Sequence, residues 1–375
     1  MNKTPKVAIV ILNWNGVKHL RQFLPSVLSS VWPNFEIIIG DNASTDGSLE
    51  FIEREYPSIK IIKNDQNYGF TGGYNRVLNQ VDADYFILLN SDVEVFPGWI
   101  APVISLMESD PLIAAAAPKI KAYLQKDYFE HAGAAGGFID KFGYMFCRGR
   151  MFYEIEQDRG QYQQSGEVFW ASGAAMFIKK HCWDEAGGFD ESFFAHMEEI
   201  DLCWRLKNMG YKVMYCAESE VFHLGGGTLN VENPFKTYLN FRNNLTLLKK
   251  NLSFWRALVV IPIRFCMDLL AIFRFLNEGK RRDAWAVSRA HQYFVVHLFK
   301  VRKTGSPEVR KPKGVGSQTS EVGRRKPANT ANRQLLPITI GTNSSLKGMY
   351  KGSLVWDFFV KKKRHFTDLD QADFL

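Results

Sequence analysis

The stretch VAIVILNWNG, residues 7–16, decides the fold class. Residues 7–12 are all apolar, as expected of a parallel β-strand that is covered on both faces. A helical pattern follows at 18–31, and a second strand is expected at 36–40. The alternation continues with expected helices at 48–55 and 71–81 and expected strands at 59–63 and 85–89. Strands separated by helices predict an α/β fold built around a parallel sheet.

Composition sets limits on the class of protein. The chain has 375 residues, of which 46% are hydrophobic, so it can form one large domain and an appendage. The five cysteines include no CxxC pair, which argues against a disulfide framework or zinc site and indicates reduced thiols in a cytosolic setting. The apolar run at 7–12 is also too short for a signal peptide.

Polar residues follow each of the first four expected strands, at 13–15, 41–46, 64–67 and 90–92. Ligands of such sheets bind at the carboxyl ends of the strands. Aspartate and asparagine also favour turns and helix caps, so any one set could be structural, and Asp46 could cap the helix that follows it. Four sets at one sheet edge favour a binding site. Asp92 is the best candidate to coordinate Mg²⁺ or Mn²⁺, because these cations prefer oxygen ligands.

A cluster of carboxylates stands further along the chain. Glu198, Glu199 and Asp201 occupy three of four positions at an expected helix start. Like charges that lie close together raise a pKa and can create a general base, although acidic residues in a first turn also simply favour the helix dipole. His223 precedes three glycines and could complete a metal site, but a lone histidine is more often structural.

Six motifs occur in a fixed order and carry a resemblance to a known family. They are NWNG (13–16), DNASTDGS (41–48), NYGFTGGYN (67–75), NSDV (90–93), WASGAAM (170–176), and GGFDESFF with MEEIDLCWR (187–205). Together they resemble the family 2 glycosyltransferases, and most of all their rhamnosyltransferase-type branch, over residues 5–250. The resemblance implies a GT-A fold, a Rossmann-like mixed sheet flanked by helices.

The resemblance also implies roles for single residues. Asp41 would contact the nucleobase, Asp92 would be the remaining acid of a DxD metal motif, and His223 would be a second metal ligand for Mg²⁺ or Mn²⁺. Glu199 would be the catalytic base, with Glu198 and Asp201 beside it. The donor, a dTDP- or UDP-sugar, would be held by Asn13, Asn15, Asp41, Asn42, Ser44, Asp46, Asn67, Gly69, Phe70, Gly73, Asn75, Asn90 and Ser91, and the acceptor side would be lined by Trp170, Ser172 and Gly173.

Two positions depart from the family pattern. Asn90 replaces the first Asp of DxD and removes one charge from the metal site. Glu199 replaces the usual Asp and lengthens the base by about 1.5 Å, a distance at which positioning affects rates. No QxxRW motif of the processive synthases is present. The resemblance therefore implies an inverting, non-processive transferase that moves a sugar, with rhamnose suggested by the branch, to a lipid-linked glycan in bacterial surface polysaccharide synthesis.

The chain changes character after residue 240. We expect a catalytic domain at 1–240, an amphipathic helical region at 241–302 and a basic, partly disordered tail at 303–375. The apolar stretch 254–276 carries four charges that fall on one side of a helix: Arg256, Arg264, Asp268 and Arg274. Such a helix suits a membrane interface, or it could dock on the catalytic domain through its apolar face.

A basic run supports the membrane interpretation. Residues 300–326 contain nine lysines and arginines against two glutamates, which is either a solvated linker or an attraction to anionic lipid. We therefore expect a cytoplasmic protein, peripheral on the inner face of the cytoplasmic membrane. Nucleic acid is not an expected partner, because the run has too few aromatic residues to stack bases.

Two rival functions remain. A dinucleotide-binding oxidoreductase shares the βαβ start, but no GxGxxG follows the first strand. The second is a catalytically inert protein of the same fold that binds nucleotide sugar or glycan, for which Asn90 is the best argument.

Overall fold

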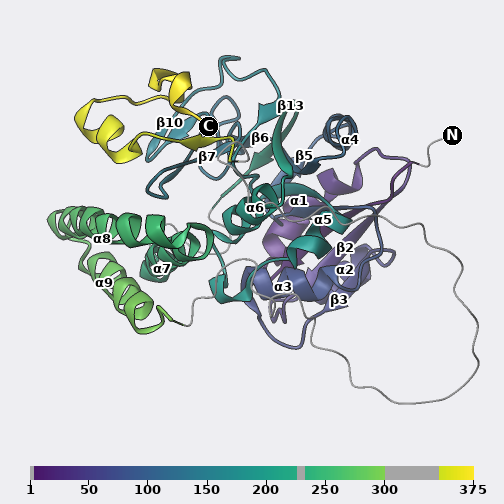
Figure 1. Ribbon diagram of the computed structural model, residues 1–375. Coiled ribbons are helices and arrows are strands. Elements are labelled where there is room, and N and C mark those ends of the chain that lie inside the picture. Colours follow the sequence, from purple (N-terminus) through teal and green to yellow (C-terminus); the bar gives the residue numbers. More distant parts are fainter. Residues whose placement is uncertain (1–3, 226–232, 300–345) are drawn as a thin grey trace, which may run out of the picture.

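The computed structural model describes residues 4–225, 233–299 and 346–375. Two β-sheets and a helical arm make up these residues (Figure 1). The larger sheet has nine strands and the smaller has five. Helices α7 (Pro234–Asn251), α8 (Phe254–Asn277) and α9 (Arg281–Val296) extend from this body on one side, and the C-terminal segment lies on the smaller sheet.

The first part of the chain forms the expected βα alternation. Strand β1 lies between β2 and β4 and is parallel to both, and β3 pairs with β2. The apolar side chains of β1 and β4 are buried, which is why these runs are continuous in the sequence. The elements are β1 (Val7–Asn13), α1 (Val17–Leu28), β2 (Phe35–Asp41), α2 (Ser48–Glu55), β3 (Lys60–Lys63), α3 (Gly69–Leu78) and β4 (Tyr85–Leu89).

The sheet becomes mixed beyond β4. Strand β12 (Ala175–Lys179) runs antiparallel between β4 and β6 (Ile113–Ala122). The long strand β13 (Lys212–His223) is parallel to β6 and antiparallel to β5 (Val93–Val95), so His223 pairs with Val93. The expected mixed sheet is thus confirmed. Strand β11 (Gly166–Glu167) and helices α4 (Ile100–Glu108), α5 (Lys180–Ala186) and α6 (Glu198–Asn208) complete this body.

The smaller sheet joins residues far apart in the sequence. Its strand order is β10 (Glu154–Ile155), β9 (Arg150–Met151), β8 (Met145–Cys147), β7 (Gly137–Asp140) and β14 (Met349–Tyr350). The rings of Phe138 and Phe366 lie 4.7 Å apart, and those of Phe366 and Phe374 lie 5.3 Å apart. Residues 346–375, which we expected within a partly disordered tail, are therefore folded onto this sheet. Residues 303–345, including most of the basic run, lie outside the described residues.

Three helices form the arm: α7 (Pro234–Asn251), α8 (Phe254–Asn277) and α9 (Arg281–Val296). The expected boundary at residue 240 falls inside α7, and the division into domains stays a prediction. Among the helices of the described ranges, none is long and apolar enough to cross a membrane.

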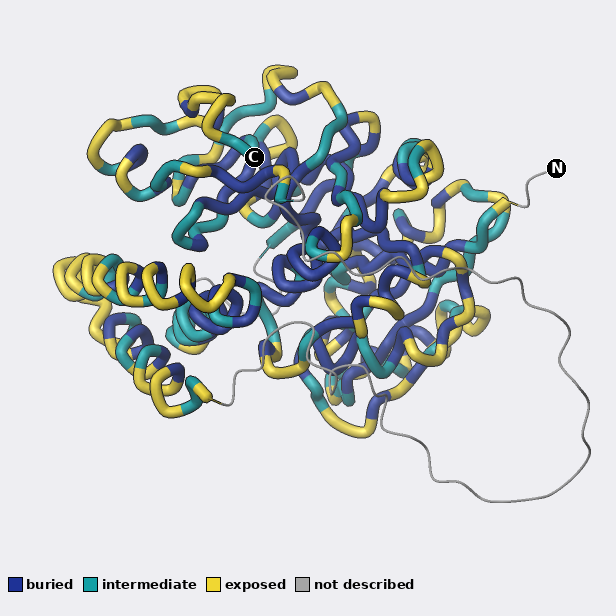
Figure 2. Tube along the Cα trace, in the orientation of Figure 1, coloured by how far each residue is buried: buried dark blue, intermediate teal, exposed yellow. Residues whose placement is uncertain are grey.

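Helix α8 turns two of its four charged residues inward, while Arg256 and Arg274 are exposed. Arg264 and Asp268 are buried in an ion pair of 2.8 Å, and Asn244 on α7 accepts from Arg264 at 2.6 Å. His291 on α9 lies 3.1 Å from Asp268. The opposite side of α8 is exposed along its length (Figure 2), and its apolar members there include Val259, Leu269, Leu270, Phe273 and Leu276. Helix α8 thus contacts the core through Ala257 and Val260 and through the ion pair, while most of its large apolar side chains are exposed, and membrane association stays a prediction.

Candidate active site

The ends of β1 and β2 are joined by polar contacts. Asn13 Nδ2 donates to Asp41 Oδ1 at 3.3 Å and to Ser44 Oγ at 3.0 Å. The backbone N–H of Ser44 donates to Asp41 Oδ2 at 3.0 Å. Within the described residues, buried Asn13 Oδ1 has no hydrogen-bond partner. The edge expected to receive the nucleobase is thus rigid, and it holds a free buried acceptor.

Asp46 stabilises the same loop by accepting hydrogen bonds from backbone N–H groups. Its carboxylate accepts from the backbone N–H of Val17 at 2.9 Å and of Ser48 at 3.1 Å, which are the first residues of α1 and α2. Burial alone would raise its pKa, but these hydrogen bonds hold the pKa of Asp46 below its ordinary value. Asn15 likewise accepts from the N–H of Thr45 at 2.7 Å. We assign Asp46 to capping the two helices and leave it out of the proposed nucleotide contacts.

The third loop is held by Asn42 at the end of β2. Its Nδ2 donates to Asn67 Oδ1 and to the carbonyl of Gly69, both at 2.9 Å. A Cβ at Gly73 would lie 2.8 Å from a methyl group of Leu12 and 3.0 Å from Asn42 Nδ2. Gly73 is therefore required for the close packing of α3 against the sheet.

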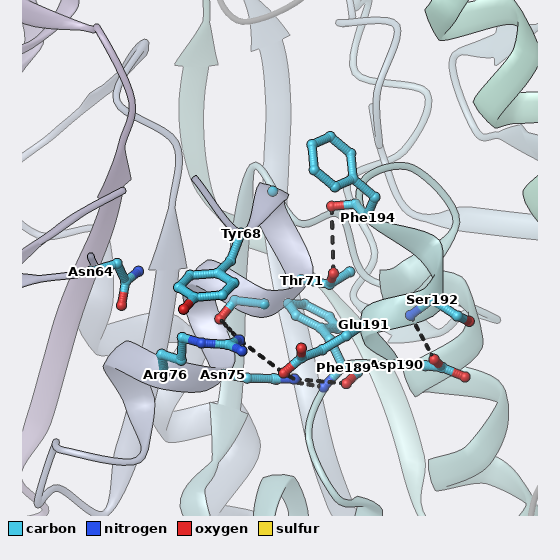
Figure 3. Close-up of polar contacts among 12 residues, drawn as sticks. Asn64, Tyr68, Thr71, Asn75, Arg76, Phe189, Asp190, Glu191, Ser192 and Phe194 are labelled. Carbon is cyan, nitrogen blue, oxygen red and sulfur yellow. Dashed lines mark hydrogen bonds and ion pairs between the residues drawn. The ribbon is translucent and has the colours of Figure 1, made fainter. Parts of the chain in front are cut away.

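Helix α3 is bound to the loop 189–194, which leads to the acidic cluster (Figure 3). Asn75 donates to the carbonyl of Phe189 at 2.9 Å and accepts from its N–H at 3.0 Å. The N–H of Phe70 donates to the carbonyl of Phe194 at 2.8 Å. Asn75 and the backbone of Phe70 thus fix the position of this loop, a role that the motif alone did not indicate.

Strand β13 brings His223 to the expected metal motif. His223 Nε2 lies 3.2 Å from Asp92 Oδ1 and 3.4 Å from Asn90 Nδ2. In the described parts of the chain, no group of three His, Cys, Asp or Glu side chains is arranged to hold a metal ion. Two protein ligands still suit Mg²⁺ or Mn²⁺ in such a site, because Mg²⁺ usually keeps several waters and binds substrate phosphates. Asp92 and His223 are the residues that could hold it.

A second carboxylate, Glu130, stands behind the histidine and was missed from the sequence. Its Oε2 lies 3.4 Å from His223 Nδ1. Burial disfavours the imidazolium form, but the hydrogen bonds and charges of Asp92 and Glu130 raise the pKa of His223 to about 10, so the ring must release a proton before it can bind a cation. Burial likewise opposes ionisation of Asp92, yet His223 holds the pKa of Asp92 below its ordinary value. Glu130 lies in a loop outside every motif, so the sequence held no signal for it.

Glu198 and Glu199 are the first two residues of α6. Burial of the carboxyl group raises the pKa of Glu199 to about 7. Burial, and then the charge of Glu199, raise the pKa of Glu198 well above its ordinary value. Each has one buried Oε2 without a hydrogen-bond partner among the described residues. A carboxylate that titrates near neutral pH and has a free oxygen is suited to general-base work.

Both carboxylate oxygens of Asp201, the third acid of the cluster, accept hydrogen bonds from other residues. Its Oδ2 accepts from Arg205 Nε at 2.9 Å, and Lys250 Nζ lies 3.0 Å away. Asn251 on α7 donates to Oδ1 at 2.9 Å. Because both oxygens are bound and the residue is buried, we keep Asp201 out of the proposed chemistry. It joins α6 to α7.

The segment 170–174 connects the two halves of the site. The N–H of Asn90 donates to the carbonyl of Ala174 at 3.0 Å. At its other end, the N–H of Ala171 lies 3.5 Å from the sulfur of Cys203, one turn after Glu199 on α6. The loop that carries Asp92 and the helix that carries Glu199 therefore both contact this segment.

The residues expected on the acceptor side mostly hold this segment in place. Trp170 is buried, and its Nε1 donates to the carbonyl of Phe138 in β7 at 3.0 Å. Ser172 Oγ donates to the carbonyl of Ala132 at 2.6 Å. A Cβ at Gly173 would lie 3.3 Å from the ring of Phe70. These contacts make Trp170 and Ser172 positioning residues in this structure.

Comparisons with known proteins agree with this arrangement. The model of the Glycosyl transferase family 2 matches residues 8–184. N-acetylglucosaminyl-diphospho-decaprenol L-rhamnosyltransferase of Mycobacterium tuberculosis is 26% identical over 310 residues, which is 77% of this chain and 100% of that protein. Low-salt glycan biosynthesis hexosyltransferase Agl10 of Haloferax volcanii is 22% identical over 282 residues, covering 73% of this chain and 86% of its own.

A solved structure supports the fold. The crystal structure of GalNAc-T7 with UDP, GalNAc and Mn²⁺ superposes with a TM-score of 0.52 at 17% identity, over 66% of this chain and 48% of that one. This chain thus spans about half of that structure, and the likeness concerns the GT-A fold. With the sheet, the ordered motifs and these matches in hand, residues 8–184 form a family 2 glycosyltransferase domain, and the chain is rhamnosyltransferase-like and an enzyme that transfers a glycosyl group.

Proposed function

We propose that the protein transfers one sugar per encounter from a nucleotide diphosphate to an acceptor hydroxyl, with inversion. Glu199 takes the proton of the hydroxyl while its oxygen bonds to the anomeric carbon, and the bond from that carbon to the diphosphate oxygen breaks on the opposite face. A divalent cation held by Asp92 and His223 would neutralise charge on the departing diphosphate. The free buried oxygen of Glu199, on a carboxyl with a pKa of about 7, carries this proposal.

The donor proposed is a dTDP- or UDP-sugar, and rhamnose is the first sugar to test. The relative named an L-rhamnosyltransferase is matched along its whole length. Asp41 would accept from the imide N–H of uracil or thymine through the lone pairs of its carboxylate that Asn13 and Ser44 leave free. Asn13, Asn42 and Asn90 with Ser91 would surround the rest of the donor.

The proposed acceptor is a lipid-linked glycan, in the synthesis of a bacterial surface polysaccharide. The name of the Mycobacterium tuberculosis relative gives N-acetylglucosaminyl-diphospho-decaprenol as its acceptor. A lipid-linked substrate requires an enzyme that works at a membrane surface, and the exposed apolar side of α8 offers one.

Release of nucleotide diphosphate from candidate nucleotide sugars tests the activity. We expect one donor to give release with Mg²⁺ or Mn²⁺ and none after chelation. Asp92→Asn should reduce the rate at least about tenfold and raise the metal concentration needed for half-maximal activity, since it removes a charged ligand. Thermal stabilisation by Mn²⁺ should weaken in the same variant. Tight binding of a nucleotide sugar with no release under any condition would instead support an inert binding protein.

Membrane association at the cytoplasmic face is proposed through the outer side of α8. Leu270 and Phe273 are 63% and 68% exposed. We expect the protein to sediment with phosphatidylglycerol vesicles. The double variant Leu270→Glu, Phe273→Glu should lose at least about 90% of this binding, because each of the two apolar side chains contributes about 1.5–3 kcal/mol when it is buried in the membrane. Leu124, which is 79% exposed on the catalytic body, supplies the control Leu124→Glu. Equal loss in the control would contradict the assignment to α8.

A further inference from the structure

A groove lies between the start of α7 and the first half of α9. It has a volume of about 240 Å³ and is lined by Pro234, Phe235, Tyr238, Arg282, Trp285, Ala286 and Arg289. Arg282, Trp285 and Arg289 are spaced three and four residues apart, so they share one face of α9. The rings of Phe235 and Tyr238 are stacked at 6.2 Å on the facing helix. The groove is therefore aromatic, with a guanidinium at each end of its α9 wall.

Both guanidiniums are available to an anion. Arg282 and Arg289 are exposed, and neither has a carboxylate partner within the described part of the chain. Arg289 lies over the ring of Tyr238 at 5.3 Å, a contact that holds it at the groove without neutralising its charge. The nearby carboxylate Asp283 instead accepts from the hydroxyl of Thr237 on α7 at 2.5 Å. Guanidinium pairs are well matched to phosphate oxygens.

An aromatic contact links the groove to the loop that precedes the proposed catalytic carboxylates. The ring of Phe235 contacts the ring of Phe194 at a centroid distance of 6.3 Å. Phe194 ends the loop that α3 fixes, and it precedes Glu198 by four residues. Arg242 on α7 strengthens this connection, since it donates to the carbonyl of Phe193 at 2.8 Å and lies over Tyr238 at 5.6 Å. The aromatic strip thus leads from the start of α6 to α9.

We propose that this groove binds the diphosphate and the first lipid units of a lipid-linked acceptor. Arg282 and Arg289 hold the diphosphate, while Phe235, Tyr238 and Trp285 contact the start of the hydrocarbon chain. The sugar at the other end of the diphosphate then extends along Phe194 to Glu199. This inference rests on the proposed function, and it adds the chemical feature by which the acceptor is recognised.

Binding of farnesyl diphosphate to the full chain, followed by tryptophan fluorescence and calorimetry, tests the groove directly. We expect the double variant Arg282→Ala, Arg289→Ala to bind farnesyl diphosphate at least about tenfold more weakly for each guanidinium removed. A tenfold loss of affinity corresponds to about 1.4 kcal/mol. The variant Arg282→Lys, Arg289→Lys should recover part of the affinity, because charge remains while the planar fork is lost. Arg256→Ala, Arg281→Ala removes two arginines of α8 and α9 that do not line the groove, and it should bind as the wild type does. Inorganic pyrophosphate should bind more weakly than farnesyl diphosphate.

Steady-state transfer separates this inference from the proposed function. The alanine pair should raise KM for a farnesyl-diphosphate-linked sugar by the same factor, and leave kcat and the donor KM unchanged. An alkyl glycoside of the same sugar should be used equally by wild type and variant. An unchanged KM for the diphosphate acceptor, or loss of vesicle binding in place of farnesyl diphosphate binding, would overturn the groove assignment. A wild type that binds farnesyl diphosphate through these arginines but transfers no sugar would overturn the proposed function alone.

Discussion

Replacing Glu199 by glutamine is expected to lower kcat by about 10² to 10⁴-fold, the range that a positioned general base contributes. The amide keeps the size and the hydrogen-bonding capacity of the side chain but cannot accept the proton of the acceptor hydroxyl. Thermal stability and donor KM should change little, because Glu199 Oε2 has no hydrogen-bond partner among the described residues. A variant that retained near wild-type kcat would show that another group takes the proton.

The pH profile of the wild type provides a second readout of Glu199. Its pKa is raised to about 7, so the carboxylate form that can act as a base increases as pH rises through that value. We therefore expect kcat/KM to fall on the acid side with a midpoint near pH 7. Glu198→Gln should leave this midpoint nearly unchanged, because Glu198 has the higher pKa and is still uncharged when Glu199 titrates, and the amide can replace the hydrogen bond that Glu198 donates to Glu199.

Removal of Asp201 is expected to have the largest effect on stability. Asp201→Ala would leave the buried cations Arg205 and Lys250 without this carboxylate, and breaking a buried ion pair from one side costs about 3–5 kcal/mol. The measurement is the free energy of unfolding in urea. Asp184→Ala is the matched control, since Asp184 pairs with Lys180 at the same i,i+4 spacing in an exposed position and should change stability by less than about 1 kcal/mol.

Equal destabilisation by Asp201→Ala and Asp184→Ala would mean that the contacts of Asp201 with α7 contribute little. A variant that keeps its stability but loses activity would instead return Asp201 to the catalytic group. Activity loss that follows the loss of stability is the expected pattern, because α6 also carries Glu199.

The sequence was informative wherever a strand is buried on both faces. Strand β4 and helix α2 have the expected bounds, because an apolar run or a clear helical pattern ends where the element does. The smaller sheet escaped prediction, since its strands are only two to four residues long and one comes from residues 349–350. No pattern of such length can be told from a loop.

The motifs identified the neighbourhood of the site better than the role of each residue. Asp92 and His223 come together as expected, because β13 pairs with β5. Asp46 and Asn75, however, direct their polar groups to the backbone of neighbouring loops. A short polar side chain after a strand can bind a ligand or hold a loop, and only its partners in three dimensions distinguish the two.

Strand β14 has a consequence for how the molecule is made. Met349 pairs with Ile139, so the smaller sheet gains this edge strand only after some two hundred further residues have left the ribosome. Until then the rings of Phe138 and Phe146 would lack Phe366 and Phe374 as neighbours. Nascent chains would therefore depend on chaperones during this interval. A truncated protein that ends before residue 349 should aggregate for the same reason.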